Sequence, residues 1–260
     1  MGEDYNSHVP KRTKTASMKL QLATWPDIRD YLEHSDAVLV PIGSTEQHGP
    51  TGLIGTDAIC PEHIAGGMAE QGVLVAPTLS IGMAQHHLRF PGSITLRPTT
   101  LMAVIRDVVM SLASQGFRRF LFLNGHGGNI ATVQAAFADI YADASLGGGE
   151  SGLVLELFNW FQGPRVGALS RELFGDAEGS HATPSEVSLT WDAYPDAARQ
   201  APMTPERAPK GPIRDAADYR ARFADGRIGS EPQLASVAHG ARLYEAGLDD
   251  AMERWRILTG

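Results

Sequence analysis

The stretch "AVLVPIGSTEQHGPTGLIGTDAI" (37–59) decides the fold, because it joins a buried strand directly to a group of charged side chains. Its first part, 37–43, is almost entirely apolar, which is typical of a strand covered on both faces of a sheet. Its second part presents Glu46, His48 and Asp57 among glycine, proline and threonine residues. Ligands bind at the carboxyl ends of the strands in parallel α/β sheets. The stretch therefore predicts a site at the end of this strand.

Short apolar runs and stretches with helical periodicity alternate along the rest of the chain. The expected strands are 72–78, 117–125 and 152–160, and the expected helices are 99–116, 129–144 and 232–258. Gly116 is suited to stop a helix and Asn129 to cap one. Strand–helix–strand order with short connections predicts an α/β fold, a single-domain three-layer α/β/α sandwich with a mostly parallel central sheet.

Composition excludes several classes of protein. The chain has 260 residues, 43% hydrophobic and 20% charged, which suits one large domain or two small ones. The single cysteine, Cys60, excludes an intrachain disulfide framework and indicates a cytoplasmic location. No apolar run approaches the ~20 residues of a membrane span. The net charge of −8, with no basic cluster beyond "KRTK", argues against nucleic-acid binding.

Two segments stand apart from the regular pattern. Residues 1–18 are polar and lack the apolar core of a signal peptide, so we expect a disordered tail before a domain spanning 19–260. Residues 194–232 form a proline-rich, charged excursion without periodicity. Irregular segments of this length in compact domains are usually functional or contact a partner.

Further polar residues follow the other expected strands and complete a candidate metal site. His126 follows the strand 117–125, and Glu186 lies in "GDAEGSHATPSEVSLT" (175–190). With Glu46, His48 and Asp57 they form a nitrogen and oxygen ligand set without thiolate, which suits zinc or manganese. Five ligands with one shared carboxylate suit two metal ions.

A structural role remains open for each of these residues taken singly. A histidine or carboxylate beside glycines is often a cap, a turn former or a surface residue. The glycines of "NGHGGN" could simply allow a tight turn between strand and helix. They are not a dinucleotide-binding fingerprint, because Ile130 stands where the G-x-G-x-x-G spacing requires glycine.

The motifs "PIGSTEQHGPTGLIGTDAI", "HLRFPGSITL", "NGHGGN", "SHATPSE" and "GSEPQLAS" resemble, in order, the landmarks of the creatininase (creatinine amidohydrolase) family. The resemblance covers roughly residues 20–258. It implies an α/β/α sandwich with two divalent metal ions and hydrolysis of C–N bonds in amides, often cyclic ones. It also implies a homo-oligomer, in many members a homohexamer.

The resemblance assigns roles to individual residues. Glu46, Asp57 and His126 would hold one metal ion, and His48, Asp57 and Glu186 the other, with Asp57 bridging both. In creatininase itself a tyrosine and a metal-binding glutamate follow the "NGH". Here those two positions are glycines, so Glu186 is the natural candidate for the missing glutamate ligand.

His181 matches the family position assigned to proton transfer. A second departure is Ser230, where the family more often has aspartate, and we expect the loss of a cap or salt bridge there. Two further residues are candidates for substrate contact. His87 would line the pocket or be a satisfied loop histidine, and Trp160 would stack on a flat substrate or pack in the interior.

Together these observations predict a metal-dependent amidohydrolase acting on a cyclic amide, a formamide or a similar small substrate. Two divalent ions, zinc first and manganese second, would hold a bridging hydroxide that attacks the carbonyl, and His181 would protonate the departing nitrogen. The alternatives are a peptidase like the family member that trims the mycofactocin precursor, and a non-catalytic metal- or ligand-binding protein. A nucleotide-binding enzyme is disfavoured by the missing Walker and dinucleotide patterns.

Overall fold

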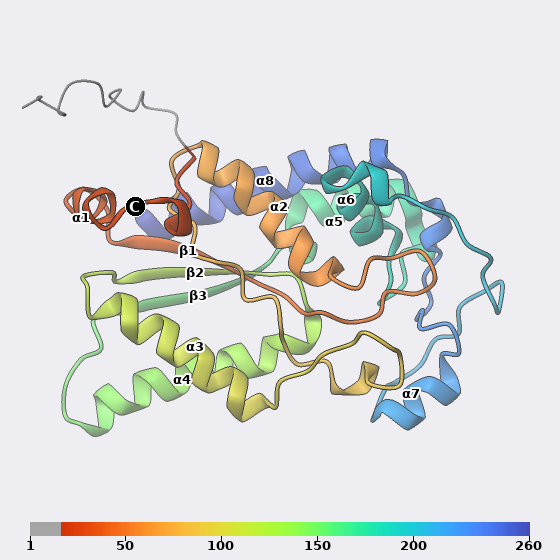
Figure 1. Ribbon diagram of the computed structural model, residues 1–260, viewed down its shortest axis with the longest axis horizontal. Coiled ribbons are helices and arrows are strands. Elements are labelled where there is room, and N and C mark those ends of the chain that lie inside the picture. Colours follow the sequence, from red (N-terminus) through yellow and green to blue (C-terminus); the bar gives the residue numbers. More distant parts are fainter. Residues whose placement is uncertain (1–16) are drawn as a thin grey trace, which may run out of the picture.

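A parallel sheet forms the centre of the molecule, as expected for an α/β protein (Figure 1). The computed structural model describes residues 17–260. Its three strands, in the spatial order of the chain, are β1 (Ala37–Ile42), β2 (Arg119–Asn124) and β3 (Val154–Asn159). All pairings are parallel, and the register aligns Ile42 with Asn124 and Asn124 with Asn159. The three carboxyl ends therefore meet at one edge of the sheet.

Helices cover both faces of this sheet and make it the middle layer of a sandwich. The helices are α1 (Trp25–Leu32), α2 (Thr56–Glu70), α3 (Pro98–Ala113), α4 (Ile130–Leu146), α5 (Pro164–Phe174), α6 (Pro184–Ala193), α7 (Ala216–Arg222) and α8 (Val237–Thr259). In Figure 1, α3 and α4 lie on one face, and α2 and α8 lie on the other with α5 and α6 beside them. The expected single-domain α/β architecture is confirmed.

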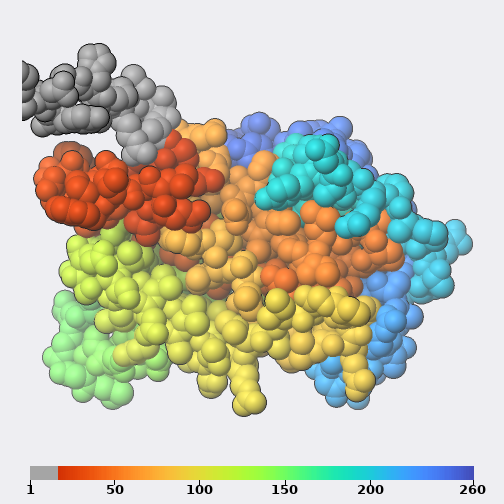
Figure 2. Space-filling view, viewed as in Figure 1, coloured from red at the N-terminus to blue at the C-terminus, as the bar shows by residue number. Residues whose placement is uncertain are grey.

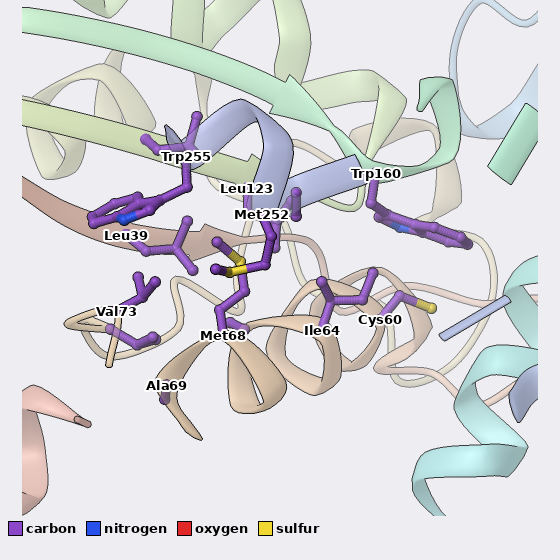
Figure 3. Close-up of a cluster of buried hydrophobic side chains, with 14 of the residues drawn as sticks. Leu39, Cys60, Ile64, Met68, Ala69, Val73, Leu123, Trp160, Met252 and Trp255 are labelled. Carbon is purple, nitrogen blue, oxygen red and sulfur yellow. The ribbon is translucent and has the colours of Figure 1, made fainter. Parts of the chain in front are cut away.

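Alternate side chains of the strands build two separate cores. On the α2 and α8 side, Leu39 and Leu123 pack with Ile64, Met68 and Trp255 (Figure 3). On the opposite side, the remaining strand residues pack against α3 and α4, in a cluster that includes Val38, Val40, Phe120, Phe122, Ile105 and Phe137. Two apolar faces on one strand explain why the sequence 37–42 is apolar throughout.

The expected strand 72–78 runs beside β1 but is only partly paired. Ala76 N donates to Leu39 O at 2.8 Å, and Leu79 N donates to Pro41 O at 2.9 Å. These contacts remain isolated bridges outside the named strands. Pro41 faces this segment and has no N–H to donate, so the ladder is interrupted there. The prediction of a full strand is wrong for this reason.

The expected helices 99–116 and 129–144 correspond to α3 and α4, but the predicted cap of α4 is wrong. Asn129 stands before the helix without a side-chain capping bond. Its Nδ2 donates to Gly43 O at 2.9 Å, and its Oδ1 accepts from Met83 N at 3.0 Å. Asn129 therefore ties together the loops at the end of the sheet. The final helix begins later than expected, at Val237, where the Ser236 Oγ accepts from the backbone of His239.

The proline-rich excursion lies at the end of the molecule toward which the strands run (Figure 1), and its residues near 200 project there in Figure 2. It contains α7 and otherwise little regular structure. Its later part returns to the sheet end, where Ser180 N donates to Ile228 O at 2.9 Å. The excursion therefore borders the site expected beyond the carboxyl ends of the strands.

The expected tail, 1–18, lies almost entirely outside the described residues. Within them, Met18 N already donates to Ala69 O at 3.1 Å. In the described part of the chain, 17–260, no helix combines the length and the apolar character needed to cross a membrane.

Candidate metal centre

The five predicted ligands converge just beyond the carboxyl ends of β1 and β2. Glu46 and His48 follow β1, Asp57 lies in the first turn of α2, and His126 follows β2. Glu186 lies in the first turn of α6. The first four are buried, with 0–6% of their surface exposed. Buried carboxylates and imidazoles at this density need cations or protons to balance them.

Asp57 lies at the centre and directs one oxygen to each side. Its Oδ1 is 3.0 Å from His48 Nε2, and its Oδ2 is 2.9 Å from His126 Nδ1. Burial disfavours the charged imidazoles, but Asp57 outweighs it and raises the pKa of His48 to about 10. Glu46 and Asp57 together raise the pKa of His126 to about 9. In turn, the two histidines overcome burial and hold the pKa of Asp57 far below its usual range.

Glu46 is fully buried and lies close to two histidines, His126 and His87. Its Oε2 accepts from Ser44 Oγ at 3.0 Å and lies 3.3 Å from His126 Nε2. Its Oε1 lies 2.9 Å from His87 Nε2. Burial raises the pKa of Glu46 to about 7.

Glu186 serves α6 as well as the cluster. Its Oε1 accepts from Thr183 N at 2.6 Å, while Thr183 Oγ1 accepts from Glu186 N, which completes a capping box. The same Oε1 lies 3.8 Å from His48 Nε2. Burial raises the pKa of Glu186 to about 7. The helix start therefore fixes this carboxylate at the rim of the cluster.

The cluster has the properties of a cation site. Glu46 Oε1 and Asp57 Oδ2 each lie 2.9 Å from an imidazole nitrogen, yet neither is in hydrogen-bond geometry with any described residue. A buried carboxylate oxygen without a hydrogen-bond donor is costly unless a cation or a proton approaches it. Ligand atoms within 4.8 Å of one another occur in three overlapping groups, whose members are Glu46, His48, Asp57, His87, His181 and Glu186. Nitrogen and oxygen donors of this kind suit zinc or manganese.

His181 borders the cluster with one nitrogen free. Its Nε2 lies 2.9 Å from Gln47 O, and a carbonyl can only accept, so Nε2 carries the hydrogen. Its Nδ1 is then bare and lies 3.9 Å from Glu46 Oε1. Burial, with the positive charge of His48, holds the pKa of His181 well below its usual value. The ring is therefore neutral with a proton-accepting nitrogen toward the cluster.

Gln47 is buried and contacts both His87 and His181, and it was not identified from the sequence. Its Oε1 accepts from Gly49 N at 2.9 Å, which fixes the orientation of the amide. Its Nε2 lies 2.9 Å from His87 Nδ1 and 3.0 Å from Gly226 O. These two acceptors use both amide hydrogens, because His181 Nε2, although equally near, is itself a donor. Gln47 therefore fixes the position of both neighbouring imidazoles.

The structure separates the two weaker sequence candidates. His87 is 1% exposed, contacts Glu46 and lines the cavity above the cluster. Trp160 is also 1% exposed, but it packs in the α2–α8 core and does not line that cavity (Figure 3). The expectation of substrate stacking on Trp160 is thereby corrected. The adjacent Phe161 lines the cavity instead.

A cavity of about 550 Å³ opens over the cluster. Besides the predicted residues, its walls include His86, Glu178, Ser185, Ile213 and Tyr219. Ile213 and Tyr219 come from the excursion, where no local pattern marks them. In the sequence, only the expected nearness of the excursion to the site pointed to these two residues.

Glycines let the backbone approach the ligands. A Cβ at Gly43 or Gly125 would lie 2.1 or 2.0 Å from Asp57 O, and one at Gly128 would lie 2.4 Å from His126 Nε2. Gly127, by contrast, has open space around it. By the family resemblance, Gly128 stands at the position of a metal-binding glutamate in creatininase itself.

Ser230, the other departure noted in the sequence, is buried and donates its hydroxyl to His181 O at 2.5 Å. It therefore supports the segment that carries His181, so a polar contact is present at this position.

Sequence comparison decides the family, since residues 21–254 match the family described as creatininase, creatinine amidohydrolase. This chain belongs to the creatininase family. Members of the family are hydrolases, as the names of several relatives state.

Among those relatives is the mycofactocin precursor peptide peptidase of Mycolicibacterium smegmatis, 28% identical over 84% of this chain and 85% of its own. Another is the creatinine amidohydrolase of Pseudomonas putida, 29% identical over 66% of this chain and 70% of its own. Among solved structures, a manganese creatininase superposes with a TM-score of 0.79 at 24% identity, over 93% of this chain and 98% of its own. That likeness supports the creatininase fold.

Proposed function

We propose that this protein is a binuclear-metal-dependent amidohydrolase that cleaves a C–N amide bond in a small substrate. The observation that carries the proposal is the convergence of five nitrogen and oxygen ligands and His181 beneath one cavity, with two buried carboxylate oxygens left without hydrogen bonds.

The contacts of Asp57 are compatible with the ligand assignment that the family resemblance implies. Asp57 gives one oxygen to the His48 side and the other to the His126 side, as a bridging carboxylate does. Glu46, Asp57 and His126 would then hold one cation, and His48, Asp57 and Glu186 the other. His87 touches Glu46 and would orient that ligand from outside, as partners of metal ligands commonly do.

When bound, two such cations would supply a bridging water of lowered pKa as the nucleophile and a Lewis acid for the carbonyl oxygen. Zinc is the first choice and manganese the second, from the donor set. The protons now held by His48 and His126 would leave when metal binds, because ligands must be deprotonated.

The chain itself supplies proton transfer and orientation. The neutral His181 would first accept a proton at Nδ1 from the attacking water. It would then deliver that proton to the departing nitrogen, which is a poor leaving group without it. This order refines the simpler expectation of a proton donor, since the resting ring has no proton at that atom. Gln47 and Ser230 hold His181 in place through its Nε2–H and its backbone carbonyl.

The relatives act on different compounds, so the substrate is proposed only by class: a cyclic amide, a formamide or a similar small amide. A peptidase activity is the second candidate, favoured by the coverage of the mycobacterial relative. We also propose a homo-oligomer, a hexamer by family resemblance, which light scattering at micromolar concentration would test.

The deciding experiment combines metal analysis with a substrate panel. Purified protein reconstituted with zinc or manganese should bind about two ions per chain and hydrolyse at least one small amide or peptide. Fewer than half an ion per chain after reconstitution with either metal would refute the metal site.

A further inference from the structure

His86 is a buried polar side chain in the cavity wall to which no described residue hydrogen-bonds. It lies in the short 3₁₀ helix Gln85–His87, is 8% exposed and lines the cavity over the cluster. Its ring packs against those of His87 and Tyr219, at centroid distances of 4.2 and 5.8 Å, but neither of its nitrogens forms a hydrogen bond within residues 17–260. A buried polar group without a partner is costly, and the cavity is the open side from which a partner can come.

The neighbouring side chains on this wall already have partners. Tyr219 donates its hydroxyl to a backbone carbonyl at 2.7 Å. His87 accepts from Gln47 at Nδ1, and its Nε2 lies 2.9 Å from Glu46 Oε1. Of the three packed rings, His86 is therefore the one that remains available to a ligand.

The charge state of the ring limits what it can bind. Burial lowers the pKa of His86, so near neutral pH the ring is uncharged and carries one N–H donor and one bare acceptor nitrogen. Among residues 17–260, the cavity lining contains no lysine or arginine, and burial raises the pKa of the one lining carboxyl outside the proposed ligand set, Glu178, to about 7. An anionic group would find no lysine or arginine to pair with here. A hydroxyl, which both donates and accepts, matches either nitrogen of the neutral ring.

The ring lies beside the proposed metal ligands and not among them. Its centroid is 6.4 Å from that of His126. In the described chain, His86 also belongs to none of the groups whose ligand atoms lie within 4.8 Å of one another. A group bound to His86 is thus a different part of the substrate from the amide that would meet the cations.

We propose that His86 binds a hydroxyl group of the substrate, so that the site favours small amides with a hydroxyl away from the scissile C–N bond over their methyl analogues. This inference rests on the proposed function in taking a small amide as the substrate. It narrows the substrate class from small amides in general to hydroxyamides.

A purely structural role for His86 is the alternative, in which the ring only packs against His87 and Tyr219. Phenylalanine keeps an aromatic ring at this position but removes both nitrogens. Glutamine loses the ring but keeps a donor and an acceptor. His86→Phe therefore retains packing without hydrogen bonding, and His86→Gln retains hydrogen bonding without the ring.

The test compares three hydroxyamides with their methyl analogues: glycolamide with propanamide, 3-hydroxypropanamide with butyramide, and 4-hydroxybutyramide with pentanamide. Each pair differs only by a hydroxyl in place of a methyl group, so the series also locates the hydroxyl relative to the amide. Dissociation constants for the zinc-loaded protein are measured by ligand-observed NMR titration near neutral pH, and any probe that is hydrolysed is compared by kcat/KM. In at least one pair, the wild type should favour the hydroxyamide about three- to tenfold, the net gain of one hydrogen bond.

His86→Phe should remove this preference by weakening the binding of the hydroxyamide alone, and His86→Gln should keep a smaller preference. His34→Phe is the matched control, because it makes the same substitution at an exposed histidine that does not line the cavity, and it should behave as the wild type. If His86→Phe proves unstable by its melting temperature, His86→Leu, which also lacks the nitrogens, takes its place.

Equal binding within all three pairs by the wild type, or an unchanged preference in the variant without nitrogens, would overturn the inference. The binding comparison needs no turnover. A preference that depends on His86 in a protein without hydrolase activity would therefore count against the proposed function alone. Hydrolysis of amides without that preference would count against the inference alone.

Discussion

The "NGHGGN" motif contains a matched pair of glycines that tests how the fold positions Asp57. An added Cβ at Gly125 would lie 2.0 Å from Asp57 O, whereas contacts shorter than 3.4 Å are already tight. Backbone must then shift by more than 1 Å at the first turn of α2. Gly127, two residues on, has nothing within 4 Å of an added Cβ and no positive φ.

Gly125→Ala should therefore lower stability by about 1–3 kcal/mol, the usual cost of overpacking. For a chain of this size that corresponds to a fall in Tm of roughly 3–10 °C. Metal binding should suffer more, because ligand distances tolerate only about ±0.2 Å. Gly127→Ala should leave Tm and metal content unchanged.

Differential scanning calorimetry and elemental analysis of both variants measure the two effects. The reasoning is refuted if Gly125→Ala matches the wild type in Tm and metal content, or if Gly127→Ala loses as much as Gly125→Ala. Either result would mean that Asp57 is not held by the close approach of these strand ends.

Three further predictions concern the site. Asp57→Ala should lose more metal and activity than Glu46→Ala or His48→Ala, because it removes a ligand from both ions; wild-type turnover in Asp57→Ala would contradict the bridging role. His181→Ala should keep its metals and lose turnover by ~10²–10⁴-fold, with a smaller loss on an activated anilide; a metal-free variant would make His181 a ligand. The raised pKa of Glu178 means that the metal-free folded protein keeps a proton that the unfolded chain has lost, so this contribution to stability is complete below about pH 4.5 and is lost as pH rises through about 7. The melting temperature of metal-free Glu178→Gln should therefore fall less between about pH 4.5 and about pH 7 than that of the metal-free wild type.

The sequence predicted those parts of the site that follow strands. The predicted residues Glu46, His48 and His126 lie close together because the carboxyl ends of neighbouring parallel strands meet at one edge. Asp57 joins them because the loop 43–55 leads from the end of β1 into the first turn of α2. Glu186 entered the predicted ligand set by its residue type and was then matched by the family resemblance, although nothing in local spacing tells where the start of α6 lies in space.

The remaining differences have specific physical causes. The segment 72–78 has the composition of a strand, but Pro41 on the neighbouring strand removes the donor it would need. Asn129 has the residue type of a cap, but its amide bonds instead to Met83 N, to Gly43 O and to the Asn124 side chain at the end of β2. Gln47 and Glu178 gave no signal, because the amide of Gln47 contacts His87 and Gly226, 40 and 179 residues away, and the cavity beside Glu178 is not described by the sequence.

The last prediction follows from the buried carboxylates of the cluster, whose negative charge only protons balance in the metal-free protein. Glu46 and Glu186 have pKa values raised to about 7 by burial, and Asp57 is balanced only by the protons on His48 and His126. A divalent cation offsets the carboxylates directly and binds the folded site but not the unfolded chain. Metal at 100 times its dissociation constant should then stabilise the protein by about 2.7 kcal/mol per site. That corresponds to a rise in Tm of roughly 5–10 °C for each occupied site. Asp57→Asn, which keeps the shape of the side chain, should abolish most of this rise. A metal-independent Tm in the wild type would show that protons alone satisfy the cluster, and that its carboxylates were not arranged around cations.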